Sequence, residues 1–221
     1  MDEGPFAIRF ADLPVVLPIF PLSGALLLPH GRLPLNIFEP RYLNMTLDAL
    51  GHARMIGMIQ PTDPDAAEPV PVYPTGCAGR ISSFAETDDG RLQITLTGVC
   101  RFRINSEIES VRGYRRVIAD YAPFAGDLEA PDDDDEGIDR ERLLAALRPY
   151  FRLREMKVNW EVIEDAPATA LVTSLAMLCP FATAEKQALL EAPSLRRRAE
   201  VMTSLMEMAV FDQGSRGTAR Q

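Results

Sequence analysis

The sequence predicts an α+β protein, with a β-rich N-terminal part followed by a C-terminal α-helical bundle. Residues 91–104 (RLQITLTGVCRFRI) alternate apolar and polar side chains, which is typical of a strand with one buried face. Residues 125–137 (AGDLEAPDDDDEG) concentrate acidic charge, and apolar residues recur at helical spacing after them. We therefore expect a β subdomain over residues 1–124, an acidic linker over 125–137, a helical bundle over 138–212 and a disordered tail over 213–221.

The β subdomain contains a series of short segments with strand character. They cover residues 33–38, 54–60, 79–87, 91–105 and 114–121. Asp88, Asp89 and Gly90 form a strong turn signal, so the two segments around them should pair as an antiparallel hairpin. Gly98 lies within the longest segment and indicates a bulge or a tight bend there.

A cluster of acid, base and phenol follows the first of these strands. Residues 42–50 show helical spacing and end at Gly51, which places Pro40 in the first turn of a helix. Glu39 then lies where the positive end of the helix dipole favours a carboxylate. No nucleophile or second base accompanies the cluster, so we interpret it as a structural signature that ends one element and starts the next. The signature comprises Phe38, Glu39, Pro40, Arg41 and Tyr42.

The C-terminal part has the spacing of short helices. Four are expected, around residues 143–151, around 171–178, after Thr183 and after Ser194. Pro149 should kink or end the first of them. Trp160 lies between helices, where packing is its expected use, and the methionines of the last helix are also expected to pack in the core.

Composition excludes several classes of protein. The net charge is −9, and the acidic segment 125–137 supplies seven negative charges, which disfavours binding to nucleic acid or to an anionic membrane. The uncharged run from Leu13 to Leu28 contains three prolines and follows an acidic start, so it is neither a spanning helix nor a signal peptide.

Cysteine and histidine usage indicates a reducing compartment and no metal. Cys77, Cys100 and Cys179 are far apart and form no CxxC, so we expect cytoplasmic localisation without disulfides. His30 and His52 have no ligand-spaced partners, which argues against a metal site.

Motifs of catalysis and cofactor binding are missing from the sequence. It contains no GxxxxGK[ST], GxSxG, HExxH or GxGxxG. Its two lysines, Lys157 and Lys186, follow no glycine-rich loop. We therefore predict no catalytic residue, no cofactor and no enzymatic activity.

Several segments, in order, resemble the Lon N-terminal domain, the substrate-recognising domain of Lon-type ATP-dependent proteases. The segments are LPIFPLSGALLLPHGRLPLNIFEPRYLNM, the pair GRI and GVCRFRI, LVTSLAMLCPF and AEKQALLEAP. The resemblance covers roughly residues 13–211. It implies a PUA-like, six-stranded β pseudo-barrel with one helix, followed by an α-helical bundle.

The resemblance also implies a function. Lon proteases continue into an ATPase domain and a Ser–Lys protease domain, whose motifs are missing here. We therefore expect a standalone, non-catalytic protein of this family that binds unfolded or specific polypeptides. It would act in protein quality control or as an adaptor for an ATP-dependent protease. Met156, Trp160 and Phe181 are the candidate polypeptide-binding residues.

RNA binding is the alternative, because PUA-like barrels in other proteins bind RNA. Arg101 and Arg103 are predicted to share the solvent face of one strand, with Arg115 and Arg116 on the next. Such a stripe could contact phosphates. The overall acidity and the missing aromatic interleaving disfavour this alternative.

Overall fold

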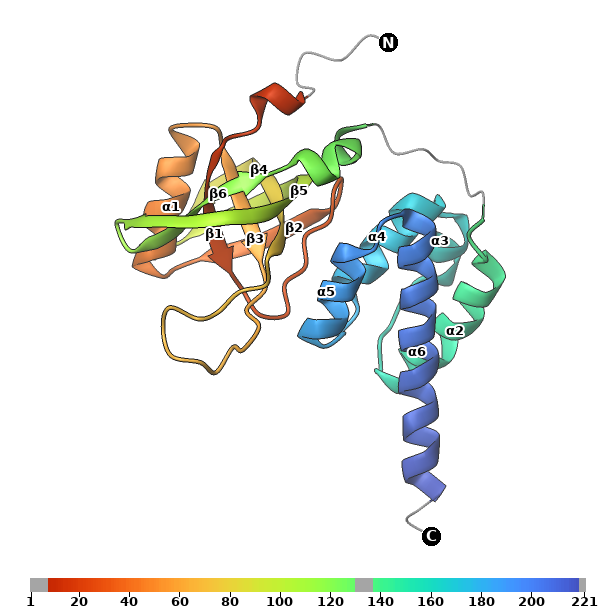
Figure 1. Ribbon diagram of the computed structural model, residues 1–221. Helices are drawn as coiled ribbons and strands as arrows, with labels where there is room; N and C mark the ends of the chain where they lie inside the picture. Colours follow the sequence, from red (N-terminus) through yellow and green to blue (C-terminus); the bar gives the residue numbers. More distant parts are fainter. Residues whose placement is uncertain (1–7, 130–136, 219–221) are drawn as a thin grey trace. The chain divides into compact units, whose positions relative to one another are not determined.

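The computed structural model describes residues 8–129 and 137–218, with side chains to residue 213. Its described elements are mainly strands in the first half, with α1 between β2 and β3, and helices in the second half (Figure 1). In chain order they are η1 (Phe10–Asp12), β1 (Val16–Pro21), β2 (Arg32–Ile37), α1 (Pro40–Leu50), β3 (Met55–Ile59), β4 (Thr75–Glu86), β5 (Leu92–Val111), β6 (Tyr114–Asp120), η2 (Ala122–Leu128), α2 (Arg140–Leu153), α3 (Trp160–Asp165), α4 (Ala168–Leu178), α5 (Thr183–Glu191) and α6 (Leu195–Thr218).

The six strands form one sheet in the order β2-β5-β4-β3-β1-β6. A further pairing of β5 with β6 closes β5, β4, β3, β1 and β6 into a ring, with β2 attached to the first half of β5. β1 pairs with β3 in parallel, and the other pairs of described strands are antiparallel. The α+β prediction and the predicted hairpin, now β4 and β5, are therefore confirmed.

Strand β5 pairs with β2 through its first half and with β6 through its second half, because it bends at its middle. Gly98 pairs with Gly79 and Cys100 pairs with Ala78, so Val99 is an extra residue at a β-bulge. A Cβ atom at Gly98 would lie 1.9 Å from the carbonyl oxygen of Leu28, so only glycine fits this approach. The bulge or bend predicted at Gly98 is confirmed.

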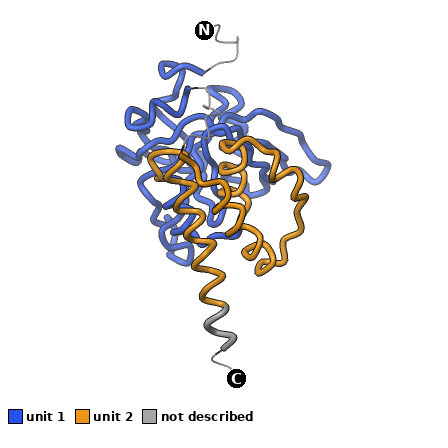
Figure 2. Tube along the Cα trace, turned by 90° about the vertical axis from the view of Figure 1, so that its right-hand side faces the viewer, with its two compact units in different colours: residues 1–130, 180–190 blue, residues 131–179, 191–221 orange. Residues whose placement is uncertain are grey.

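The chain contacts divide the protein into two compact units (Figure 2). Unit 1 comprises residues Met1–Ala130 and Pro180–Leu190, and unit 2 comprises Pro131–Cys179 and Glu191–Gln221. The helical bundle expected over 138–212 thus includes residues that the contacts group with the sheet.

Helix α5 is the helical element of the second half that belongs to unit 1. The Nε2 of Gln187 donates to the carbonyl oxygen of Thr75 at 3.1 Å, and the Nζ of Lys186 donates to that of Gly24 at 2.5 Å. Leu189 and Leu190 are buried. The backbone carbonyl groups of Thr75 and Gly24 therefore find hydrogen-bond donors on α5. Helical spacing in the sequence does not reveal contacts between residues so far apart in the chain.

Unit 2 is built on the pairing of α2 with α6. Their buried side chains include Leu143, Leu147, Tyr150, Met202 and Met206. The methionines of α6 thus pack in the core as predicted, except for Met208, which is exposed. Helix α2 continues through Pro149 to Leu153, and Trp160 opens α3, a short helix that the sequence did not predict.

The acidic linker is shorter than expected. Helix η2 runs to Leu128, and Asp127 within it is buried against Arg101, so the prediction of a solvated linker is wrong for residues 125–128. A paired aspartate can be buried where consecutive unpaired ones cannot. Residues 130–136 lie outside the described residues. At the other end, α6 continues to Thr218, beyond the predicted start of the tail at 213.

Candidate functional site

A cavity of about 160 Å³ in unit 1 brings together the cluster that ends β2 and residues far from it in the sequence. Its walls come from the first turn of α1, the end of β1, the start of β6 and the loop after β3. The lining residues are Pro21, Ser23, Arg41, Tyr42, Pro61, Pro64, Glu68, Val70, Gly113, Tyr114 and Arg115. A small hollow with convergent polar groups is a candidate binding site.

The first turn of α1 places Arg41 and Tyr42 at this cavity. The helix begins at Pro40 with Glu39 as its N-cap, which confirms the predicted cap. The Glu39 side chain makes no capping hydrogen bond and instead accepts one from the Nε of Arg41 at 3.1 Å. Consecutive residues of a helix project in different directions, so Arg41 reaches the rim while Tyr42 is buried. The cluster therefore ends a strand and also lines a cavity.

Glu68 forms the opposite wall of the cavity. The Nη1 of Arg41 donates to its carboxylate at 2.8 Å. This hydrogen bond lowers the pKa of Glu68 below its ordinary value. Burial raises the pKa of the Tyr42 phenol, so both groups keep their neutral-pH charge states.

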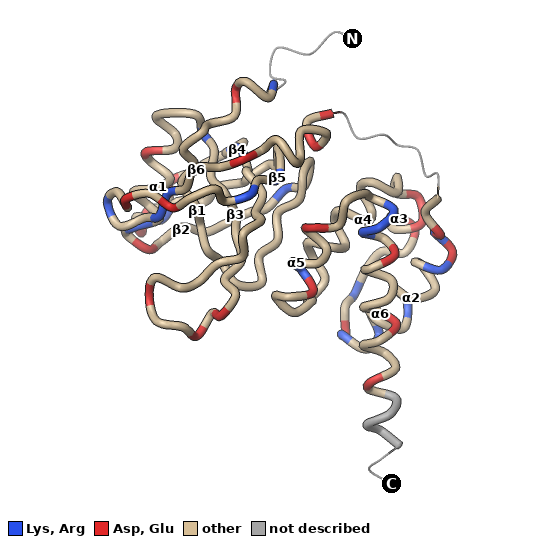
Figure 3. The backbone as a smooth tube through the Cα atoms, viewed as in Figure 1, with Lys and Arg blue, Asp and Glu red and all other residues tan. Residues whose placement is uncertain are grey.

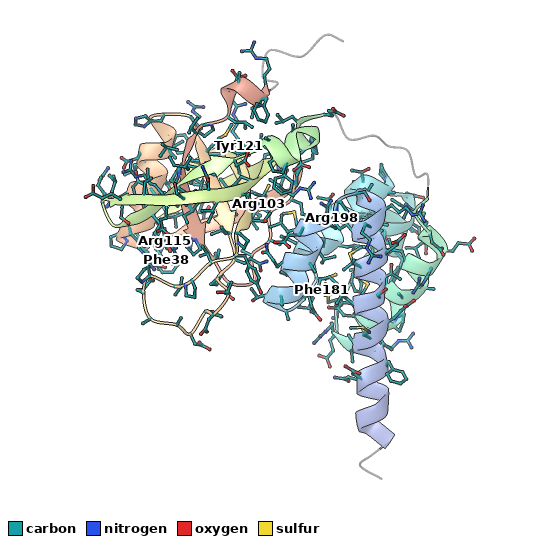
Figure 4. The ribbon with its side chains drawn as sticks, viewed as in Figure 1. Phe38, Arg103, Arg115, Tyr121, Phe181 and Arg198 are labelled. Carbon is teal, nitrogen blue, oxygen red and sulfur yellow. The ribbon has the colours of Figure 1, made fainter. Side chains whose placement is uncertain are left out.

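Arg115 and Tyr114 contribute from the start of β6. Arg115 lies in unit 1, where Figure 4 labels it. It donates to both carboxylate oxygens of Glu107, at 2.7 and 2.8 Å, and to the carbonyl oxygen of Val70 at 2.6 Å. This pairing lowers the pKa of Glu107. The hydroxyl of Tyr114 donates to Asp48 at 2.9 Å. Arg115 therefore fixes the loop after β3 to the sheet.

The predicted solvent face of Arg101 is wrong. Its side chain is 9% exposed, and its guanidinium donates to both oxygens of Asp127, at 2.8 and 2.7 Å. Its Nη1 also donates to the carbonyl oxygen of Leu190 at 3.1 Å. Cys100 and Phe102 are buried and Arg103 is exposed, so the predicted alternation holds beyond Gly98. Arg101 is buried because η2, through Asp127 and Phe124, and the end of α5 cover its side chain.

The other arginines of the RNA-binding alternative differ in their exposure to solvent and in their bonding partners. Arg115 is paired as described above, and Arg116 donates to the backbone carbonyl of Glu109. Arg103 is exposed and forms no ion pair with any described residue. Acidic and basic residues are interspersed along unit 1 (Figure 3). RNA binding stays a prediction from the sequence, with one of its four arginines open to solvent and unpaired in the described chain.

The three candidate polypeptide-binding residues are divided between the two units. Met156 and Trp160 belong to unit 2 and are half-buried. The Trp160 ring lies 6.0 Å from that of Phe151 and 4.3 Å from the guanidinium carbon of Arg148. Phe181 belongs to unit 1 and is buried. Their role in binding stays a prediction.

Sequence reasoning missed the part of the cavity that comes from the loop after β3. Residues 61–74 are rich in proline, aspartate and alanine, which is typical of a surface loop, and nothing in this composition indicates that Glu68 meets Arg41. The pairing spans 27 residues, and a lone glutamate in a proline-rich loop carries no local signal.

A second hollow, of about 360 Å³, lies in unit 2 between α2 and α6. It is lined by Arg142, Ala145, Ala146, Pro149, Glu207, Val210 and Phe211. Arg142 and Glu207 form an ion pair at 2.7 Å, and the rest of the lining is apolar.

The described residues contain neither a metal-binding cluster nor a membrane-spanning helix. Among residues 8–129 and 137–218, no group of three or more His, Cys, Asp or Glu side chains could hold a metal ion. No helix in the same residues has the length and apolar character needed to cross a membrane.

Comparison with known proteins identifies one family. The family described as the ATP-dependent protease La (LON) substrate-binding domain matches residues 16–208. Lon protease 2 of Myxococcus xanthus is 27% identical over 222 residues, covering 91% of this chain and 24% of that protein. Lon protease of Escherichia coli K12 is 22% identical over 205 residues, covering 89% and 25%. The chain spans about a quarter of the length of the curated relatives that it matches.

Solved structures agree in fold. The Lon N-terminal domain protein from Xanthomonas campestris matches with a TM-score of 0.58 and 25% identity, over 86% of this chain and 98% of that one. The N-terminal domain of Mycobacterium avium complex Lon protease matches with a TM-score of 0.57 over 87% and 98%. At 15% identity, the second match is informative about the fold alone.

Proposed function

This chain belongs to the family of ATP-dependent protease La (LON) substrate-binding domains, and we propose that it is a non-catalytic module that binds polypeptides. Its ligands are exposed apolar segments of unfolded or damaged proteins. The observation that carries the proposal is the family match, which extends over residues 16–208. Because the curated relatives are Lon proteases, a role in protein quality control, as an adaptor for an ATP-dependent protease, follows from the same proposal.

The non-catalytic part of the proposal rests on the matched region and on the motifs. The match falls in the substrate-binding domain, and the sequence lacks the P-loop of an ATPase and the nucleophile turn of a serine hydrolase. The pure protein, incubated with ATP and an unfolded substrate, is expected to leave that substrate intact. Cleavage would contradict the proposal.

An exposed apolar strip on unit 1 supports polypeptide binding. Phe84 on β4 stands opposite Ile94 on β5, which stands opposite Leu35 on β2, so the three side chains share one face of the sheet. Phe84 is 53% exposed and Leu35 is half-buried, whereas Ile94 between them is buried. Phe38, at the end of β2, is also exposed. Large exposed apolar side chains next to one another are typical of interaction surfaces.

The strand that carries Phe84 also has an open edge. β3 pairs with β4 only as far as Arg80, so among the described strands residues 82–86 are paired on one side, by β5. Unpaired backbone groups at a sheet edge can bond to an extended peptide, whatever its sequence. An unfolded segment could thus bond to the edge and cover the Phe84 ring.

The test is fluorescence anisotropy of a labelled polypeptide that cannot refold, titrated with the full chain. The same polypeptide in its folded form is the control. Binding to the unfolded form alone is the expected result. Binding to neither form would contradict the proposal and would direct the search to a specific folded partner.

Phe84 provides the first mutational prediction. Phe84→Ser should weaken binding of the unfolded polypeptide at least about fivefold, because truncating an aromatic anchor typically costs more than about 1 kcal/mol of binding free energy. Leu47→Ser is the matched control, since Leu47 is similarly exposed but lies on α1. Equal affinities for the two variants would rule out the strip as the binding surface. Thermal melts of both variants show that each is folded.

A further inference from the structure

Tyr42 is a largely buried residue whose hydroxyl is accessible to solvent. It is 7% exposed and lines the cavity of about 160 Å³ in unit 1. The hydroxyl forms no hydrogen bond with a described residue, and it is not among the fully buried polar atoms of the described chain. It is therefore available to a group that enters the cavity.

Arg41 and Glu68 provide further hydrogen-bonding capacity at the same cavity. The Nε and Nη1 of Arg41 are bonded to Glu39 and Glu68, whereas its Nη2 bonds to no described residue. A guanidinium has five N–H donors, so Arg41 retains some. The Glu68 carboxylate has about four acceptor positions and uses only part of them. A ligand would therefore meet donors from Tyr42 and Arg41 and an acceptor from Glu68.

The charges around the cavity select a neutral ligand. Two guanidiniums, Arg41 and Arg115, face three carboxylates, Glu39, Glu68 and Glu107, each of which is already ion-paired. A charged ligand would therefore lose its hydration without meeting an unpaired charge of opposite sign, whereas a neutral group does not incur this cost.

The shape of the cavity selects a side chain. Its volume of about 160 Å³ corresponds to about five water molecules at roughly 30 Å³ each. Pro21, Pro61 and Pro64 form rigid walls without N–H groups. A peptide carbonyl is flanked by chain on both sides and cannot enter such a hollow, whereas a short side chain can.

We propose that this cavity binds the side-chain carboxamide of an asparagine or glutamine in a polypeptide. The carboxamide oxygen accepts hydrogen bonds from the Tyr42 hydroxyl and the Nη2 of Arg41, and its NH₂ donates to Glu68. A carboxamide is neutral and carries both a donor and an acceptor, which are the two properties that the cavity requires. The inference rests on the proposed function, because it specifies which side chains of a bound polypeptide are recognised.

The test uses three small probes and backbone amide NMR of the full chain. The probes are N-acetylglutamine methylamide, N-acetylglutamate methylamide and N-acetylmethionine methylamide, which have similar lengths. The glutamine probe should shift the amide signals of Arg41, Gly113 and Arg115 in a saturable way. The other two should bind at least about fivefold more weakly. Equal responses to all three probes, or none to the glutamine probe, would overturn the proposal.

Two tyrosine variants separate binding from folding. Tyr42→Phe removes a hydroxyl that has no described partner, so it should keep the melting temperature and lose the glutamine response at least fivefold. Tyr114→Phe removes a hydroxyl in the same cavity that is bonded to Asp48, so it should melt lower but keep the response. A full glutamine response in Tyr42→Phe would overturn the proposal.

The outcome is independent of the test of the proposed function. If wild type and Tyr42→Phe bind the unfolded polypeptide with equal affinity and no probe shifts the cavity signals, the binding module stands and the carboxamide site is rejected. If the glutamine probe binds but no unfolded polypeptide does, the carboxamide site stands and the proposed function is rejected.

Discussion

Single residues decide how unit 1 is held together, and the pairing of Arg101 with Asp127 is the clearest case. The pair is buried, with side-chain exposures of 9% and 11%, and it joins η2 to β5. The same guanidinium bonds to Leu190 at the end of α5, and the ring of Phe124 lies 4.8 Å from its carbon. One side chain thus connects three elements. A buried charge of this kind stabilises the fold only while its partner is present.

Removal of the carboxylate charge tests this role. Asp127→Asn should lower the free energy of unfolding by about 3 kcal/mol, because it leaves the buried Arg101 guanidinium without a counter-charge. Urea denaturation measures the change. Glu200→Gln is the control, since Glu200 is paired with two arginines at the surface, and it should leave the midpoint unchanged. Equal effects of the two variants would show that Asp127 is not a structural counter-ion.

The ion pair between Glu107 and Arg115 indicates how the stability of the protein changes in acid. Arg115 lowers the pKa of Glu107, so the unfolded chain binds this proton more readily than the folded one does. The resulting stabilisation is present above the unfolded pKa of about 4.3 and is lost as the pH falls through the folded value. Urea midpoints measured at pH 6 and pH 3.5 should therefore fall less for Glu107→Gln than for wild type. An equal fall in both would exclude this pair as a source of the acid sensitivity.

At the scale of elements, the bend in β5 organises the sheet. Residues 92–97 pair with β2, and residues 103–111 pair with β6. Both pairings use one strand because the bulge at Val99 turns it between them. Gly98 lies at this turn, where its N–H donates to Gly31 at 2.8 Å and its carbonyl accepts from His30 at 2.9 Å. The segment before β2 therefore packs directly on the bend.

A side chain at this position should disrupt that packing. In Gly98→Ala the new Cβ would overlap the Leu28 carbonyl oxygen, so backbone must move, and we expect a loss of about 2 kcal/mol in unfolding free energy. Gly126→Ala is the control, because a Cβ there meets nothing within 4 Å. Urea denaturation compares them. A Gly98→Ala variant as stable as this control would mean that the segment before β2 adapts without cost.

At the scale of the whole molecule, each of the two units is built from two separate segments of the chain. The chain leaves unit 1 near residue 130, builds part of unit 2, returns to unit 1 for residues 180–190 and ends in unit 2. Helix α5 is bonded to the rest of unit 1 by hydrogen bonds that Lys186 and Gln187 donate and by one that the carbonyl of Leu190 accepts from Arg101. Two units linked in this manner are not independent folding modules.

Cleavage between the units should leave them associated. A protease site inserted between Asp132 and Asp133 divides the chain ahead of unit 2, while α5 still bonds to the sheet. After cleavage, the two fragments should elute together in size-exclusion chromatography in native buffer and separately in denaturant. Gln187→Ala with Lys186→Ala removes the bonds from two α5 side chains and should promote separation. Separation of the unmodified fragments in native buffer would contradict this expectation.

The sequence by itself determined the class of fold, the hairpin, α1 with its cap, four of the later helices, and the family. These features depend on local patterns: period-two alternation, a turn signal, helical spacing and capping residues within a few positions of one another. The segment motifs that pointed to the Lon N-terminal domain are local for the same reason.

Only the tertiary structure decided where α5 packs, that η2 and α5 cover Arg101, and that Tyr42, Glu68 and Arg115 meet at one cavity. Each depends on contacts between residues far apart in the chain. Such contacts form because backbone groups and charges must be satisfied on burial, a requirement that leaves no periodic trace in the sequence.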